Sequence, residues 1–226
     1  MLTCANGAYC GLAPEPAAEA YGLKAPSFEI TQMIKSLGYT FAGIAIFTLS
    51  MLNGVSFANA FAWSNLPWIL LSLDNIWNGT AKKMGQPAFA PLLLLAINVA
   101  CFYCGITGTN VATAALGLSG WMALNGALFA LLPSKGLEAW GMSPEPKLNA
   151  MMKNMGYSLL SNAVMVYQVN SGTEIGAAFG QSFVVMIANL LDQLFVSKGF
   201  EALEADPIPA YVWLAIQAVV VACTLA

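Results

Sequence analysis

The side chains in this sequence that could do chemistry are carboxylates and carboxamides rather than imidazoles. The 226 residues include no histidine, eleven acidic residues and eight basic ones, and every basic residue is lysine. Histidine-ligated haem, the common zinc sites and histidine-based acid–base catalysis are therefore excluded. The HExxH, GxSxG and P-loop patterns are absent as well. We expect no enzymatic activity and no metal site.

Two aspartates lie within long apolar stretches, where an ionisable group is energetically unfavourable. Asp74 and Asp192 occupy matching places in long apolar stretches, and ionisable groups in hydrocarbon are costly enough to be candidate sites. Both lie about one and a half helical turns from the end of a predicted span, with Lys82 and Lys198 a little beyond. We favour carboxylates that reach the headgroups or pair with those lysines over ligands for a cation or a pigment metal.

Other polar side chains within or beside the apolar stretches could hold a ligand. A chlorophyll-type pigment needs a ligand for its magnesium, and without histidine an amide, a carboxylate, a backbone carbonyl or water must supply it. The candidates for such pigment or polar sites are Asn98, Gln181, Gln217, Glu174, Asp74 and Asp192. Buried amides usually hydrogen-bond between helices, so we expect structural roles to predominate in this set.

The cysteines favour packing over redox chemistry. Cys101 and Cys104 have the CxxC spacing of redox and metal sites, but they fall within a predicted membrane helix and no second pair accompanies them. We expect both to be small apolar core residues. Cys4 and Cys10 could form a disulfide in an oxidising compartment, but their place on the lysine-rich side of the chain argues against one.

The composition places these residues in a membrane protein. The chain is 58% apolar and 8% charged, whereas about a quarter of a soluble domain is charged. Seven stretches approach the roughly twenty residues that cross a hydrocarbon core of about 30 Å. The predicted spans are 36–53, 59–79, 87–107, 111–133, 151–169, 174–197 and 207–226.

Related phrases recur along the chain and indicate an internal repeat. KSLGYTF at 35–41 matches KNMGYSL at 153–159, and SKGLEAWG at 134–141 matches SKGFEALE at 197–204. We predict an all-α integral membrane protein of about seven transmembrane helices, built as three tandem helical hairpins plus one unpaired C-terminal helix. Its parts are a polar, Pro- and Ala-rich N-terminal arm at 1–34, hairpin repeats at 35–84, 85–141 and 142–203, and a final single helix at 204–226.

The lysines predict the orientation of the array. Lysines and arginines in short flanking loops face the cytoplasm, and every lysine here precedes the first span or lies near a linker after span two, four or six. We expect the N-terminus and these linkers on the cytoplasmic or stromal side. The short turns, with Glu174 as their one acid, face the other side. The lysines are Lys24, Lys35, Lys82, Lys83, Lys135, Lys147, Lys153 and Lys198.

The expected function follows from this class of architecture. The predicted spans carry no charge at their middle, which disfavours a charge-coupled carrier, and span seven has no lysine to hold retinal. The Glu…Asn/His…Arg helix motif of the chlorophyll a/b antenna family is absent, since there is no arginine. We expect a non-catalytic accessory or scaffold subunit of a large membrane complex. Its partners would be membrane lipids and other integral membrane subunits, with no nucleic acid.

A photosynthetic photosystem–antenna assembly in a thylakoid membrane is the complex that we expect first, because such complexes use many histidine-poor, aromatic-rich helical subunits. Chlorophyll, carotenoid and lipid would then be the bound cofactors. The alternative is a small channel or transporter for a neutral solute, formed by the hairpins around a cavity lined by Ser64, Ser119 and Ser182. A scaffold subunit occurs only in a larger particle, whereas a carrier purifies alone.

Overall fold

The computed structural model describes residues 2–23 and 26–226, with the side chains of residues 2–6 excepted. Lys24 and the Cys4 side chain, named in the predictions above, lie outside the described part. Within it every regular element is a helix. Three hairpins and one further helix make up the long elements: α3 (Phe28–Leu52) with α4 (Phe57–Trp77), α6 (Ala90–Thr107) with α7 (Val111–Leu131), α9 (Pro146–Asn170) with α10 (Ile175–Leu191), and α12 (Ile208–Leu225).

Five of these helices are long and apolar enough to cross a membrane. They are α3, α6, α7, α12 and α10 together with the short π-helix η1 (Asp192–Val196) that extends it. The long helices α4 and α9 are too polar in composition to meet the same test. The chain is therefore all-helical with five candidate spans in its described part, two fewer than the sequence predicted.

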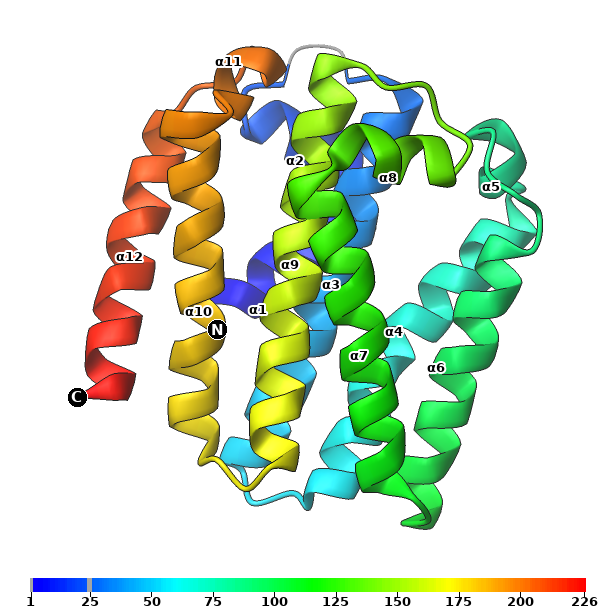
Figure 1. The fold of residues 1–226 in the computed structure, drawn as a ribbon, viewed down its shortest axis with the longest axis vertical. Helices are drawn as coiled ribbons and strands as arrows, with labels where there is room; N and C mark the ends of the chain where they lie inside the picture. Colours follow the sequence, from blue (N-terminus) through cyan, green and yellow to red (C-terminus); the bar gives the residue numbers. More distant parts are fainter. Residues whose placement is uncertain (1, 24–25) are drawn as a thin grey trace.

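Helix α9 can carry many polar side chains because it lies at the centre of the bundle. It packs against α3, α7 and α10 along its length and against short helices at one end (Figure 1). Ser158, Ser161 and Asn162 are buried there, and the Ser161 hydroxyl donates to the Ser182 carbonyl of α10 at 2.9 Å. Buried hydroxyls and amides need such partners where water is excluded. The neighbouring helices, and not lipid, therefore surround its polar side chains.

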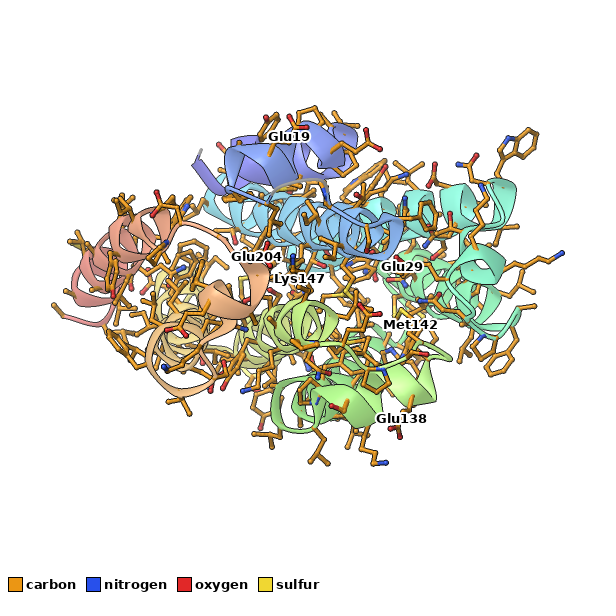
Figure 2. The ribbon with its side chains drawn as sticks, turned by 90° about the horizontal axis from the view of Figure 1, so that it is seen from above. Glu19, Glu29, Glu138, Met142, Lys147 and Glu204 are labelled. Carbon is orange, nitrogen blue, oxygen red and sulfur yellow. The ribbon has the colours of Figure 1, made fainter. Side chains whose placement is uncertain are left out.

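The linkers gather at one end of the bundle and the short turns at the other (Figure 1). The linker end carries the short helices α2 (Pro14–Ala20), α5 (Thr80–Lys83), α8 (Pro133–Ala139) and α11 (Gly199–Leu203). Seen from above, Lys147 and Glu204 lie near each other within this end (Figure 2), with Nζ and Oε2 3.2 Å apart. The linkers thus share one face, as the sequence predicted.

Each of these short helices is stopped in the same way. The residue that ends it, Gly22, Gly85, Gly141 or Glu204, has a positive φ. The next backbone N–H then donates to the carbonyl five residues earlier, which is the Schellman arrangement that closes a helix. Glycine adopts this conformation without a Cβ clash. Four linkers of one design therefore lead into the four long helices α3, α6, α9 and α12.

The N-terminal segment differs from the surface arm that we expected. Residues 2–12 form helix α1 (Leu2–Leu12), which packs along α3, and α2 follows it. Cys10, Ala17 and Ala18 are buried. The physical reason is the small size of the facing residues, since a Cβ on Gly38 of α3 would collide with the backbone of Cys10 and Gly11. Alanine, glycine and proline, which suggested an arm, instead permit close helix packing.

Equivalent contacts recur 118 or 119 residues apart. Gly38 of α3 touches the α1 backbone, and Gly156 of α9 touches the α7 backbone at Phe129 and Ala130 in the same manner. Helix α9 therefore corresponds to α3, and α1 to the second half of α7. Glu19 of α2 and Glu138 of α8 accordingly lie at opposite edges of the linker end (Figure 2). Helix α12 likewise packs on α10, as α6 packs on α4.

The α7–α9 contact gives a matched test of this packing. A Cβ at Gly126 would lie 2.8 Å from the Gly156 carbonyl oxygen, whereas a Cβ at Gly120 on the same helix would meet nothing within 4 Å. We expect Gly126→Ala to lower the free energy of unfolding by about 1–3 kcal/mol through overpacking. Gly120→Ala should leave it unchanged or raise it by up to about 1 kcal/mol. Thermal unfolding followed by circular dichroism in detergent measures both, and equal midpoints would contradict the packing described.

Candidate functional site

The two aspartates singled out in the sequence each form an ion pair with a lysine of the partner helix. Lys35 Nζ lies 2.5 Å from Asp74 Oδ2, and Lys153 Nζ lies 2.8 Å from Asp192 Oδ2. In each pair the lysine precedes the aspartate by 39 residues. The expected partners were Lys82 and Lys198, and Lys198 instead pairs with Glu201. Both pairs join the linker ends of a hairpin.

Each of these carboxylates also accepts a hydrogen bond from a second side chain. Asn78 donates to Asp74 Oδ1 at 3.0 Å. The Ser197 hydroxyl donates to Asp192 Oδ2 at 3.1 Å, and its backbone N–H bonds to the Asp192 carbonyl in the π-helical turn. No cluster of three or more acidic or cysteine side chains forms within residues that the structure describes. The aspartates therefore act as clamps, because each links the two helices of a hairpin through its lysine and accepts from one further side chain.

One cavity in the described part of the chain lies between α3, α9, α10 and α12, below the linker end. It has a volume of about 220 Å³, and we refer to it as the α12 cavity. Its walls are apolar, with Ile34, Phe41, Met151, Phe183, Met186 and Trp213 among them. The carboxamides of Gln217 from α12 and Asn189 from α10 also line it. Both residues are buried, with 7% and 3% of their surface exposed.

A smaller cavity, the α6 cavity, lies between α3, α4, α6, α7 and α9 and has a volume of about 110 Å³. Its walls include Trp68, Trp121, Trp140, Met33, Met122 and Met155. Five carboxamide residues also line it: Gln32, Asn75, Gln86, Asn98 and Asn125. Asn98 is buried and bonds through Nδ2 to the Leu94 carbonyl at 2.7 Å.

Residues that line one cavity correspond to residues that line the other at the same spacing of 118 or 119 positions in the sequence. Met33 and Met151 occupy corresponding wall positions, and Asn98 of α6 corresponds to Gln217 of α12. At the linker end Trp140 takes the place that Tyr21 holds in the α12 cavity. Each cavity therefore has an apolar wall and a carboxamide in its inner part, and residues from both halves of the chain line each of them.

Several carboxamide oxygens in the cavities have no hydrogen-bond partner in the described part of the chain. They are Oδ1 of Asn75 in the α6 cavity, and Oδ1 of Asn189 and Oε1 of Gln217 in the α12 cavity. Asn189 uses its Nδ2 to donate to Asn154 Oδ1 at 2.9 Å. An unsatisfied buried acceptor costs about 1–3 kcal/mol. These atoms can accept a hydrogen bond, but they cannot serve as nucleophiles or general bases at neutral pH.

The six predicted site residues are thus not brought together. Asn98 and Gln217 lie in the two cavities, whereas Asp74 and Asp192 lie in the ion pairs. Gln181 on α10 lines neither cavity, although its buried Oε1 has no partner among the described residues. Glu174 is exposed at the turn before α10.

The three serines expected to line a solute pathway, Ser64, Ser119 and Ser182, do not line these cavities. The hydroxyls of Ser64 and Ser182 donate to the carbonyls of Phe61 and Phe179, three residues back on their own helices. Neither cavity includes Ser64, Ser119 or Ser182. The channel alternative therefore has no observation in its favour here.

Sequence reasoning missed the carboxamides of Asn75 and Asn189 and the ring of Tyr21 as cavity residues. Asn75 stands next to the more conspicuous Asp74 in the sequence. The spacing of 118 residues between KSLGYTF and KNMGYSL is a usable signal, because it pairs the two sets of cavity walls.

Comparison with known proteins adds no template for these features. The chain matches no protein-family model, no curated protein and no solved structure. A functional proposal for it therefore rests on the cavities, the ion pairs and the helix surfaces.

The contribution of the Lys153–Asp192 ion pair to stability can be compared with that of an exposed ion pair. The two side chains are 19% and 14% exposed, so Lys153→Met leaves Asp192 largely buried without its counter-ion. We expect this change to lower the free energy of unfolding by about 3 kcal/mol, and the double change Lys153→Met with Asp192→Leu to recover most of it. Lys135→Met, which breaks the exposed Lys135–Glu138 pair, should cost less than about 1 kcal/mol. Thermal unfolding in detergent measures all three, and similar losses for the two single variants would contradict the clamp.

Proposed function

We propose that this chain is a non-catalytic accessory subunit of a large membrane complex, embedded through all seven long helices, that stabilises partner subunits and holds apolar ligands. The exposed apolar flank of α12 is the observation that carries this proposal. The two halves of the chain allow this flank to be compared with an internal counterpart.

Helix α12 has fewer neighbours than its counterpart. It packs chiefly on α10, whereas α6 packs on both α4 and α7. Its outer surface is apolar, with Val212 55% and Val219 62% exposed. Large exposed apolar surfaces mark membrane or protein contacts. We infer that a helix of another subunit takes beside α12 the place that α7 takes beside α6.

The proposal includes α4 and α9 as crossings, although their composition alone does not require it. Each is paired through a short turn with an apolar helix of similar length, and polar side chains are tolerated in a membrane when they face the interior of a bundle. With all linkers at one end, the lysine bias then puts the linkers and the start of α3 on the cytoplasmic or stromal side. Helix α1 begins near the middle of the bundle and reaches that side only at its end (Figure 1).

The specific complex that we propose to examine first is a photosystem–antenna assembly of a thylakoid membrane, with chlorophyll, carotenoid and lipid as ligands. This choice rests on analogy with a class of assemblies. Absorbance of the purified chain tests it directly. A preparation that is folded, complete in its partners and colourless would remove the pigment part of the proposal.

Native mass spectrometry after mild detergent extraction tests the subunit role. We expect the chain in a particle heavier than its own 23.8 kDa. Val219→Trp on the α12 flank should reduce recovery of the partners at least severalfold, because a bulky ring there obstructs helix contact. Leu124→Trp, on an α7 site that is 75% exposed, is the matched control and should leave recovery unchanged. A wild-type chain that is extracted alone would contradict the proposal.

A further inference from the structure

The carboxamide oxygens of the α12 cavity need a donor that the described part of the chain does not supply. Gln217 Oε1 and Asn189 Oδ1 are both buried and unpartnered, and both residues line the same cavity. Gln217 lies nine residues after the start of α12 at Ile208, or roughly 14 Å along the helix axis. Asn189 lies about one helical turn before Asp192 and is therefore nearer the linker end. Both acceptors are buried between the helices rather than at the surface.

The volume of the cavity exceeds what a single water molecule requires. A water needs roughly 10–15 Å³ of such volume and two to four polar partners, whereas this cavity has about 220 Å³ and mostly apolar walls. A ligand with an apolar body and one donor group satisfies both parts of the lining. The donor meets the carboxamides, and the body covers Phe41, Phe183 and Met186.

The charges of the residues that line the α12 cavity determine which head group a ligand can carry there. Among the residues that the structure describes, no lysine lines either cavity, and the charged residue that lines the α12 cavity is Asp206, an acid near the linker end. A phosphate or carboxylate would lack a counter-ion there and would be repelled by this side chain. The ligand that fits is therefore uncharged.

The α6 cavity repeats the arrangement with half the volume. Asn98 corresponds to Gln217, and Asn75 contributes the oxygen without a partner. Three tryptophans in its wall leave room for a slimmer part of a ligand. One ligand in each cavity is the stoichiometry that follows from this correspondence.

We propose that each cavity binds one neutral membrane amphiphile, with the chemistry of a monoacylglycerol, whose hydroxyl donates to the buried carboxamides. The ligand comes from the surrounding bilayer and lies with its chain between the helices. This inference rests on the membrane embedding in the proposed function but not on the partner subunits.

Titration of the full-length purified chain with monoolein, followed by native mass spectrometry, tests the proposal. We expect two bound monoolein molecules per chain. Methyl oleate has a similar chain and no donor, and it should bind roughly tenfold more weakly, the value of one hydrogen bond of about 1.4 kcal/mol. Equal affinity for the two probes, or no saturable binding of monoolein, would overturn the proposal.

Single substitutions assign the two molecules to the two cavities. Gln217→Met should remove the preference for monoolein at one site and leave the other intact, and Asn75→Leu, which removes the unpartnered oxygen of the α6 cavity, should do the reverse. Gln181→Met removes a buried carboxamide of α10 that lines neither cavity, so both sites should persist. Unchanged binding in both cavity variants would refute the assignment.

Filling each cavity provides a second test that does not depend on the carboxamides. Leu37→Trp projects into the α12 cavity, and Met155→Trp is the corresponding change in the α6 cavity. Each should reduce the stoichiometry from two to one. Retention of two ligands would contradict the cavity placement even if Gln217→Met failed to fold.

The outcomes separate this inference from the subunit role. Binding is measured on the isolated chain, so loss of partners does not affect it, and a lone chain that binds two monoolein molecules supports the inference while contradicting the subunit proposal. If the cavities retain a chlorin whose red absorbance disappears in Gln217→Met, the carboxamide serves as a metal ligand. The neutral-donor assignment would then be wrong.

Discussion

The bundle depends on close backbone contact at glycines of its two central helices. Gly156 of α9 lies against the α7 backbone, and Gly38 of α3 lies against the α1 backbone. In lipid there is little hydrophobic drive between helices, so van der Waals contact at short range supplies much of their association. These contacts fix α1 and α7 on opposite sides of the α3–α9 pair. The outer helices α4, α6, α10 and α12 then enclose the two cavities beside it.

Helix boundaries were largely predictable from sequence because proline and glycine mark them. The predicted spans 87–107 and 207–226 match α6 (Ala90–Thr107) and α12 (Ile208–Leu225) closely. Helix α3 starts at Phe28, eight residues before the predicted span. Hydropathy detects the membrane part of a helix, whereas the Ser27 side chain, which accepts from the Ile30 N–H, caps the real start.

The partners of the aspartates and the cavities were not predicted, and the reason is spatial. Hydropathy indicates that Asp74 lies near a lysine-rich end, but Lys35 is on another helix. The register of the hairpin could have identified it, since Gly54 in the turn lies midway between Lys35 and Asp74. Cavities depend on the side chains of five helices at once, and no single stretch of sequence reports that.

The buried polarity of α9 has a consequence for how the protein is made. A helix with two lysines and several amides and hydroxyls partitions poorly into a bilayer as an isolated segment. Helices α3 and α7 are synthesised before it and supply the surfaces that it later packs against. We therefore expect membrane insertion to follow chain order. Helix α9 should leave the translocon only after α3 and α7 have formed the surface against which it packs.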